Sequence, residues 1–454
     1  MTKPSLPQGT RDFGPEVVRK RNYIFSCIKN VFELYGFQPL ETPAFENLDT
    51  LMGKYGAEGD KLIFKILNNG LDNVEKQVQI KEDFEKLLQG KNSKGLTERA
   101  LRYDLTIPFA RYVATNHSQM LFPFKRYQIQ PVWRADRPQK GRYREFYQCD
   151  VDVVGSNSLL NEIEFCCIYH DVFSQLGIKE YTVTINHRKI LIALATICGD
   201  ADKMSIIASS IDKLEKIGLE KVKEELQTKG FNKKQLDLIE KYLLISGTNE
   251  EKLISLTELI GKTETGNKGI EEIRKVISEK PKGQNIQLDV TLARGLNYYT
   301  GIIFEAKAPE QVKIGSISGG GRYDDLTGLF GVPNIPGVGI SFGVDRIYDV
   351  MEELNLFPTT VHSGTQVLFF NLGEKESSCA FQLMQELRHK NISCELFHES
   401  VKFDKQFKYA EKKNIPYVVI IGSKELEDKT CTIKNLQKGS QENLLQHEIV
   451  TYPF

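Results

Sequence analysis

The residues best suited to chemistry lie in residues 134–144, where five cationic side chains accompany a single acid. The cationic residues are Arg134, Arg137, Lys140, Arg142 and Arg144, and the acid is Asp136. Guanidinium groups bind phosphate oxygens through paired hydrogen bonds and keep their charge at physiological pH. The segment therefore predicts a site for a phosphate-bearing ligand, with a solvated basic surface loop as the alternative.

Two further segments carry residues that could contact a ligand. LARGLNYYTG, residues 292–301, sets Arg294 beside the pair Tyr298 and Tyr299. GGGRYD, residues 319–324, leads into GVGISFGVDRI, residues 337–347, where Arg346 stands at the expected start of a helix. Glycines let the backbone approach a ligand closely, although a tyrosine pair is more often strand packing and a glycine run more often a turn. The glycine spacing is not the GxGxxG fingerprint of dinucleotide-binding sites.

The hydrophobic pattern of the sequence predicts the helices and strands that must position these residues. Residues 124–155 alternate apolar and polar types on both sides of the basic segment, which predicts two antiparallel strands joined as a hairpin. A helix is predicted over residues 16–35, ending at Gly36, and another over residues 159–176. Residues 37–45 are predicted to form a strand, and Pro39 and Pro43 place it at a sheet edge or an interface. Residues 61–125 carry short strands around a polar insert, residues 68–94, to which no element is assigned.

Later segments divide the chain further. Residues 190–285 are rich in Lys and Glu at helical spacing and predict a helical insertion between two parts of a β-rich domain. Their GKT, residues 261–263, is not a phosphate-binding P-loop, because position 256 is leucine and no strand precedes it. Strand-like patterns return over residues 286–350. After a linker, residues 353–364, a β–α–β–α–β rhythm predicts an independent domain with a small mixed or mainly parallel sheet.

Composition narrows the class of protein. At 454 residues the chain is expected to form two to four domains. It has no run of eighteen apolar residues, and its N-terminus lacks the apolar core of a secretory signal. Eight scattered cysteines fit a reducing cytoplasm, and Cys166, Cys167 and His170 are expected to pack in a buried helix rather than to bind a metal.

Charge balance bears on nucleic-acid binding. The 60 basic and 60 acidic residues cancel, so such a partner must be bound by local basic patches. Residues 402–438 offer one, with nine lysines against five acids. The alternative interpretation is that these lysines lie on a solvated helix face and bind no partner.

The order of these motifs carries a resemblance. A helix before a proline-bearing strand, an arginine hairpin, and a glycine-rich strand before a helix with an early arginine resemble the three motifs of class II aminoacyl-tRNA synthetases. RYDLT (102–106), GRYREFYQCDVD (141–152), ARGLNYYTG and SGGGRYD are similar to segments of the histidyl-tRNA synthetase family. The N-terminal PQGTRDFGPE and the C-terminal IPYVVIIG are similar as well, so the resemblance covers nearly the whole chain.

The resemblance implies an α+β fold: an antiparallel class II catalytic sheet with a helical insertion, followed by a C-terminal α/β anticodon-binding domain. The expected boundaries are 1–189 and 286–352 for the two parts of the catalytic domain, 190–285 for the insertion and 365–454 for the anticodon-binding domain. The implied activity forms histidyl-adenylate from L-histidine and ATP and transfers histidine to the 3′ end of tRNA(His). It further implies a cytoplasmic homodimer, dimerising through residues 36–45, with Mg²⁺ accompanying ATP and no Cys/His metal site.

The family's ATP-binding residues carry over onto matching positions. Arg134 corresponds to the arginine that holds the α-phosphate and the amino-acid carboxylate, and Arg346 to the one placed for the γ-phosphate. Phe146 matches the ring that stacks on adenine. The implied ATP-binding set is Arg134, Asp136, Arg142, Phe146 and Arg346. Arg134 and Arg294 are the implied catalytic residues, since Arg294 matches an arginine that stabilises charge developing at the α-phosphate, where other class II enzymes use a metal ion.

The family's histidine-binding residues carry over in the same way. Asp104, Thr106 and Gln148 are implied to hold the amino end of histidine, and Asp152, Tyr298 and Tyr299 to line its side-chain region. The implied histidine-binding set is Asp104, Leu105, Thr106, Arg134, Gln148, Asp152, Arg294, Tyr298 and Tyr299.

This chain departs from its relatives at two places. Asn297 replaces the aspartate that many relatives have, and Asp152 replaces the glutamate of some bacterial relatives, which shortens that side chain by one methylene.

Two rival functions remain. One is a regulatory synthetase-like protein, which would lack the catalytic arginines. The other is a class II ligase for threonine, proline or glycine, and the segments YYTG and QCDVD argue against it.

Overall fold

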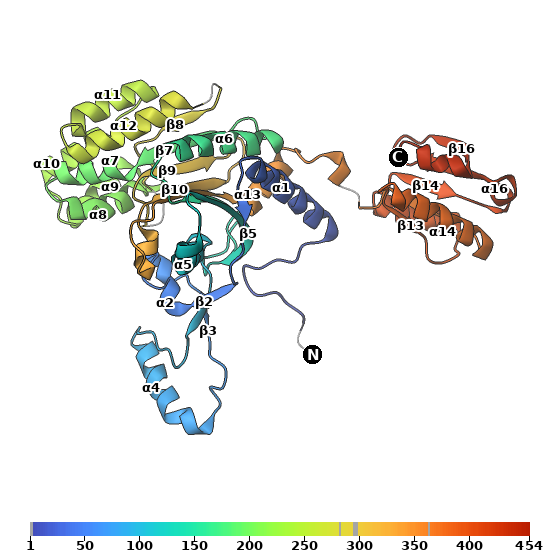
Figure 1. The fold of residues 1–454 in the computed structure, drawn as a ribbon, viewed down its shortest axis with the longest axis horizontal. Coiled ribbons are helices and arrows are strands. Elements are labelled where there is room, and N and C mark those ends of the chain that lie inside the picture. Colours follow the sequence, from blue (N-terminus) through green and yellow to red (C-terminus); the bar gives the residue numbers. More distant parts are fainter. Residues whose placement is uncertain (1–2, 281–282, 294–297, 362–363) are drawn as a thin grey trace. The chain divides into compact units, whose positions relative to one another are not determined.

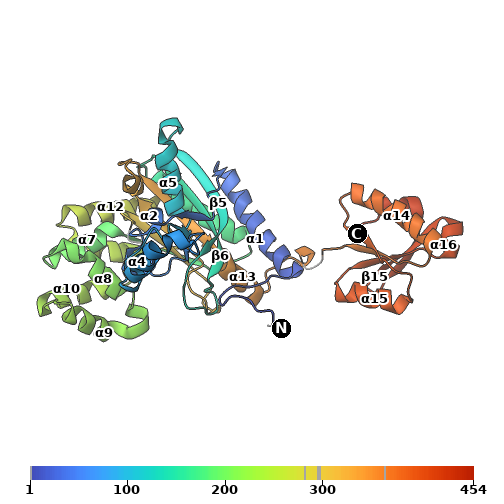
Figure 2. The ribbon, with the colours of Figure 1, turned by 90° about the horizontal axis from the view of Figure 1, so that it is seen from below.

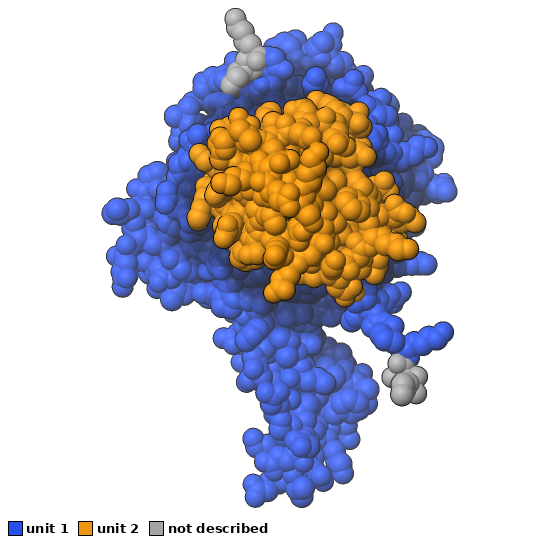
Figure 3. Space-filling model, turned by 90° about the vertical axis from the view of Figure 1, so that its right-hand side faces the viewer, with its two compact units in different colours: residues 1–11, 24–356 blue, residues 12–23, 357–454 orange. Residues whose placement is uncertain are grey.

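The computed structural model describes residues 3–280, 283–293, 298–361 and 364–454. It separates into two compact units, blue and orange in Figure 3. The first comprises Met1–Arg11 and Ile24–Leu356, and the second Asp12–Tyr23 and Phe357–Phe454. Among the described helices, none combines the length and the apolar composition needed to cross a membrane.

The first unit is built on an eight-stranded sheet in the order β1-β5-β6-β11-β10-β9-β7-β8. Neighbouring strands are antiparallel except at the two edges, where β1 pairs with β5 and β7 with β8 in parallel. The strands are β1 (Gln38–Pro39), β5 (Phe124–Trp133), β6 (Glu145–Val154), β7 (Thr182–His187), β8 (Ile286–Leu288), β9 (Ile302–Lys307), β10 (Ser318–Tyr323) and β11 (Gly337–Gly343). The predicted antiparallel sheet and the predicted hairpin, β5 with β6, are confirmed.

Aromatic side chains form the core on one face of this sheet. Phe342 of β11 packs against Phe32 of α1 (Pro15–Leu34), with ring centroids 6.0 Å apart. It also packs against Tyr169 and Phe173 of α6 (Leu160–Gln175), at 5.4 and 5.7 Å. Both helices were predicted, and Figure 1 shows them beside the strands. Because side chains alternate along a strand, Ser341 and Gly343 of β11 face the other side.

One predicted strand is wrong. Residues 37–45 do not form a single strand: β1 ends at Pro39, and β2 (Phe45–Asn47) begins a separate three-stranded sheet in the order β2-β4-β3. Pro39 and Pro43 account for the break, because proline donates no ladder hydrogen bond and disfavours continuation. The expected edge position is correct for β1. The other two strands of the small sheet are β3 (Lys65–Ile66) and β4 (Arg99–Leu101).

The N-terminal half of the first unit also contains short helices. They are α2 (Leu48–Leu51), α3 (Gly56–Asp60), α4 (Gln77–Leu88) and α5 (Thr106–Asn116). The polar insert, residues 68–94, thus contains the helix α4, on which Asp83 is the residue that is buried.

A helical segment leaves the sheet after β7 and returns at β8, its parallel neighbour. Its helices are α7 (Arg188–Ile197), α8 (Met204–Ile211), α9 (Leu214–Thr228), α10 (Lys233–Leu243), α11 (Asn249–Ile260) and α12 (Glu264–Glu279). Capping boxes begin α10 at Asn232 and α11 at Thr248 and satisfy backbone N–H groups that the helices cannot pair themselves. The predicted helical content of this segment is correct.

The second unit contains a five-stranded mixed sheet in the order β13-β12-β14-β15-β16. Its elements are β12 (Val367–Phe369), α14 (Glu374–His389), β13 (Cys394–Leu396), α15 (Phe403–Lys412), β14 (Tyr417–Ile420), α16 (Ser423–Asp428), β15 (Thr430–Asn435) and β16 (Gln441–Leu445). Val367 and Phe369 join the core under α14, whereas Leu368 joins the core under α15, so helices cover both faces (Figure 2). The predicted β–α–β–α–β order is confirmed, and two antiparallel strands extend it.

Candidate active site

A cavity of about 420 Å³ lies over the strands β6, β10 and β11 of the first unit. Its floor includes Ser341 and Gly343 of β11 and Gly319 and Gly320 of β10. A Cβ at Gly320 would lie 2.2 Å from the carbonyl oxygen of Gly339, so a larger residue cannot take this position without moving the neighbouring strand. The glycine run therefore allows β10 to pack closely against β11 and leaves no side chain at these positions on the cavity floor.

Ten of the residues predicted for the site line this cavity. They are Asp104, Thr106, Arg134, Asp136, Arg142, Phe146, Gln148, Tyr298, Tyr299 and Arg346. Leu105 and Asp152 are buried and do not line it. Arg294 and Asn297 lie outside the described residues.

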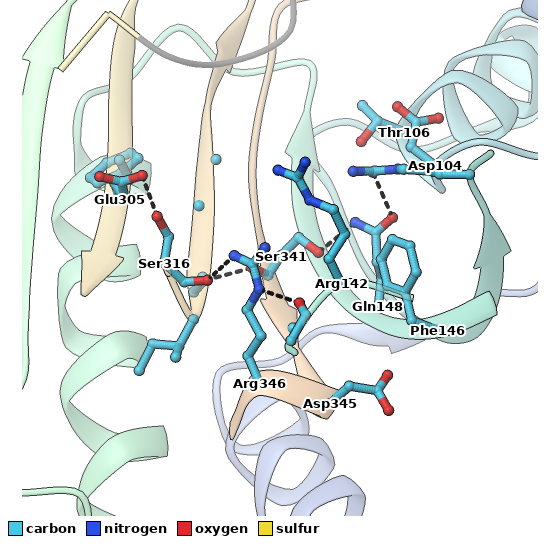
Figure 4. A pocket seen from close by; sticks show the side chains of 18 of the residues that line it. Asp104, Thr106, Arg142, Phe146, Gln148, Glu305, Ser316, Ser341, Asp345 and Arg346 are labelled. Carbon is cyan, nitrogen blue, oxygen red and sulfur yellow. Dashed lines mark hydrogen bonds between the residues drawn. The ribbon is translucent and has the colours of Figure 1, made fainter. Parts of the chain in front are cut away.

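Arg134, the first residue after β5, is held against the cavity wall. Its Nε donates to the carbonyl oxygen of Tyr103 at 3.0 Å, and its Nη2 donates to Oε1 of Gln148 at 3.3 Å (Figure 4). Its guanidinium carbon lies 4.3 Å from the ring centroid of Tyr103 and 5.2 Å from that of Phe146. The β5–β6 hairpin thus presents a fixed cation beside an aromatic ring, an arrangement suited to a phosphate and an adjoining planar base.

Asp104 supplies a buried carboxylate at the same cavity. Its Oδ1 accepts hydrogen bonds from the Tyr55 hydroxyl at 2.9 Å and the Ile107 backbone N–H at 3.2 Å. Its Oδ2 accepts one from the Tyr298 hydroxyl at 3.2 Å. Burial raises the pKa of Asp104, whereas these hydrogen bonds and the charge of Arg134 act to lower it. The result is an oriented acceptor for a cationic group such as an ammonium.

Arg346 lies near the start of α13 (Val344–Glu353) and reaches toward the hairpin loop. Its Nε donates to the carbonyl oxygen of Gly141 at 2.8 Å, and its Nη1 donates to that of Ser316 at 2.6 Å (Figure 4). Arg142 and Asp136, from the same loop, form an ion pair at 3.7 Å. Two arginines from distant segments and a third from the loop therefore line one cavity.

Asp152 lies on the same face of β6 as Gln148, but it is buried and does not line the cavity. Its Oδ1 accepts a hydrogen bond from Tyr323 at 2.5 Å, and its Oδ2 pairs with Nη2 of Arg126 at 2.9 Å. A Cβ at Gly339 would lie 2.0 Å from its Oδ1, so the glycine is required for the carboxylate to fit. Burial raises the pKa of Asp152 and of its neighbour Asp150, and the nearby Arg126 opposes that shift.

Several residues that line or brace the cavity were not predicted. Asp345 of α13 pairs with Arg11, whose guanidinium lies 3.2 Å from the ring centroid of Tyr143 in the hairpin loop. Glu305 of β9 accepts a hydrogen bond from Ser316 (Figure 4). A charged residue within the apolar strand IIFEAK was the available signal for Glu305. No sequence pattern indicates the contact of Arg11, which joins segments more than 300 residues apart.

Metal ligation was considered at the acidic and sulfur-containing side chains. Among the described residues, no cluster of three or more His, Cys, Asp or Glu side chains is arranged to hold a metal ion. Cys166 is buried in α6, and burial raises its pKa, while Cys167 is half-buried.

Comparisons with known proteins agree along the whole chain. Residues 70–347 match the family model for histidyl-tRNA synthetase, and residues 366–452 match that for the anticodon binding domain. A histidine–tRNA ligase of Christiangramia forsetii is 55% identical over 448 residues, 97% of each chain, and one of Bacteroides fragilis is 51% identical over 453 residues, 99% of this chain and 98% of the other.

Solved structures give the same fold. The histidyl-tRNA synthetase of Nostoc sp. PCC 7120 superposes with a TM-score of 0.81 at 30% identity and covers 99% of both chains. An ATP phosphoribosyltransferase regulatory subunit/histidyl-tRNA synthetase from Bacillus halodurans has a TM-score of 0.70 at 21% identity, over 90% of this chain and 97% of the other, which shows a shared fold alone. With relatives of about half-identical sequence over their full length, the chain belongs to the histidyl-tRNA synthetase family, the class II ligases of histidine and tRNA.

Proposed function

We propose that the cavity holds histidine and ATP together, so that the histidine carboxylate attacks the α-phosphate between the two substrate subsites. The observation that carries the proposal is the opposition of charges at one cavity: Asp104 supplies a carboxylate, and Arg134 and Arg346 supply guanidinium groups. Histidine brings an ammonium and a carboxylate, and ATP brings phosphates, so both signs of charge are needed there.

Histidine would bind at the Asp104 end. The carboxylate of Asp104 would accept the α-ammonium, with Thr106 and Gln148 beside it, and Tyr298 and Tyr299 would border the imidazole. Asp152 would act through Tyr323, whose hydroxyl donates to it, because Asp152 itself does not line the cavity. A subsite of oriented polar groups excludes amino acids that cannot pair with them.

ATP would bind along the hairpin. Phe146 offers its ring to adenine, Arg134 bridges the α-phosphate and the histidine carboxylate, and Arg346 receives the γ-phosphate. Asp136 and Arg142 complete the subsite from the loop. Since Arg134 touches both substrates, its charge neutralises the repulsion between their anionic groups as they approach.

Mg²⁺ and Arg294 would assist the same step. Mg²⁺ is usually held by one or two carboxylates together with substrate phosphates, and Glu305 and Asp136 present carboxylates to the cavity, so the donor set fits. The ion would neutralise charge on the departing pyrophosphate. Arg294 would stabilise the charge that develops at the α-phosphate.

Transfer to tRNA would involve the second unit. Exposed lysines on and before α15, Lys402, Lys405, Lys408 and Lys412, offer charges to a phosphate backbone. We assign residues 365–454 to anticodon binding, 1–189 and 286–352 to catalysis, and 190–285 to the insertion. The eight cysteines are scattered along the sequence without a paired framework, which supports a cytoplasmic location.

Dimerisation is proposed through residues 36–45. β1 is the edge strand of the large sheet, and Pro39 limits its pairing to one side. Sedimentation at micromolar concentration is expected to give about twice the chain mass of 51.7 kDa. A fully active monomer would contradict this interface.

The test of the proposed function is ATP–pyrophosphate exchange with each of the twenty amino acids in turn. Histidine alone is expected to support exchange. Arg134→Ala should lower kcat/KM by at least 100-fold, because such electrostatic contacts supply about 3–4 kcal/mol. Arg137→Ala is the matched control, since Arg137 belongs to the same loop but is exposed and does not line the cavity. Equal losses in the two variants, or exchange driven by another amino acid, would contradict the proposal.

A further inference from the structure

A buried asparagine holds the backbone that leads into the LARGLNYYTG segment. Asn186 of β7 is fully buried, and its Nδ2 donates to the carbonyl oxygens of Val290 at 3.2 Å and Leu292 at 2.9 Å. One amide group therefore fixes two carbonyls that are two residues apart. Such a pair of bonds sets the direction in which the chain leaves β8.

The helical insertion reaches the same backbone. Tyr242 of α10 is buried, and its hydroxyl donates to the carbonyl oxygen of Val290 at 2.7 Å. Burial raises the pKa of Tyr242, so the group stays a neutral donor. The carbonyl of Val290 thus joins a sheet residue, Asn186, to an insertion residue, Tyr242.

Arg188, the first residue of α7, contacts the LARGLNYYTG segment near both of its ends. The backbone N–H of Arg188 donates to the carbonyl oxygen of Gly301 at 2.9 Å, and its Nη1 approaches that of Ala293 at 3.5 Å. Arg188 therefore contacts the chain both before and after Tyr298 and Tyr299. The first helix of the insertion therefore begins at the residue that bonds this segment.

We propose that Tyr242 and Asn186 are positioning residues for adenylate formation, through which the insertion fixes the backbone on both sides of the segment that carries Tyr298 and Tyr299. The inference rests on the proposed function for these two tyrosines. It gives the insertion a role in the first reaction step, although none of its described helices lines the cavity. The rival explanation is that the Tyr242 hydroxyl only stabilises the insertion.

Tyr242→Phe separates the two explanations, because it removes one oxygen and keeps the ring. Ser210→Ala is the control: Ser210 is fully buried in α8 and bonds Glu225 at 3.2 Å within the same insertion. In the full-length enzyme, Tyr242→Phe is expected to lower kcat of histidine-dependent exchange at least fivefold, with KM for ATP within twofold. Ser210→Ala should leave kcat within twofold at a similar loss of thermal stability. Equal kcat values in the two variants would overturn the inference.

A double-mutant cycle keeps this result apart from failure of the proposed function. Tyr298→Phe alone should raise KM for histidine, and an unchanged KM would count against the proposed function itself. The double variant Tyr242→Phe/Tyr298→Phe should lose less kcat/KM for histidine than the product of the two single losses, because both substitutions act on one segment. Strictly multiplicative losses would refute positioning by Tyr242 while leaving the histidine subsite intact.

Discussion

Asp104→Asn tests whether the buried carboxylate binds histidine through its charge. Asparagine keeps the shape and one acceptor oxygen, and the hydroxyls of Tyr55 and Tyr298 can rotate to accept from its amide. At about 4 Å and an effective dielectric of about 20, a carboxylate attracts an ammonium by roughly 4 kcal/mol. Desolvation offsets part of this, so the net loss is expected at about 2–3 kcal/mol, a rise in KM for histidine of roughly 30- to 150-fold.

Two histidine analogues identify the cause of that loss. Histidinol keeps the α-ammonium, and imidazole-4-propionate lacks it, and both can be measured as inhibitors of exchange. The variant should bind histidinol far more weakly than the parent enzyme does and imidazole-4-propionate about equally. Similar losses for both would refute the charge argument, because they would mean that the substitution deforms the cavity.

The pH dependence supplies an independent check. Histidine binding requires the ionised carboxylate, and burial raises the pKa of Asp104 above its usual value. The protonated fraction therefore becomes significant at a higher pH than for an exposed aspartate, and KM for histidine should rise as pH falls through that range. The asparagine variant has no such group and should not show this rise.

Three further changes have defined outcomes. Hydrogen bonds from His187 and Lys189 outweigh burial and lower the pKa of Glu272 to about 2, a stabilisation that is present above pH 4.5 and lost as pH falls toward 2. Because this carboxylate is partly solvated, Glu272→Gln should lower the free energy of unfolding at pH 7 by about 1–2 kcal/mol, with a gap to wild type that narrows below pH 4.5 in urea titrations. Arg346→Ala should raise KM for ATP at least tenfold in exchange assays, as expected for a lost phosphate contact of about 1.5–3 kcal/mol, and leave KM for histidine within threefold. Deleting residues 365–454 should preserve exchange but greatly reduce tRNA charging and flatten the salt dependence of tRNA affinity; equal losses of both activities in a folded truncation would argue against an anticodon role.

Patterns with a strong period were sufficient to predict much of the fold and the site. Residues 124–133 and 145–154 alternate so regularly that the hairpin follows directly, whereas the site residues Arg134, Phe146 and Gln148 were predicted from the resemblance to a known family. The helices of residues 188–279 follow from the helical spacing of their apolar residues, and the capping box at Asn232 agrees with that pattern. These are local signals, and tertiary contacts reinforce them.

Features that depend on distant contacts could not be predicted. The helix α4 was not predicted, although Ile80, Phe84, Leu87 and Leu88 stand at helical spacing, because the many polar residues of 68–94 surround that short pattern. Asp152 is buried against Tyr323 and Gly339, two residues on neighbouring strands whose register no local pattern fixes, so its absence from the cavity lining could not be predicted. The contact of Arg11 with Asp345 likewise arises only once the sheet has formed.

The position of β11 has a consequence for synthesis of the chain. It is the last strand of the large sheet to be made, yet it lies between β6 and β10 in the middle of it. Until residues 337–343 leave the ribosome, the nascent chain holds two incomplete sheets, and β6 and β10 each present an unpaired edge. Exposed strand edges invite pairing with other chains. Chains stalled just before residue 337 should therefore depend on chaperones far more than chains stalled beyond the end of α13.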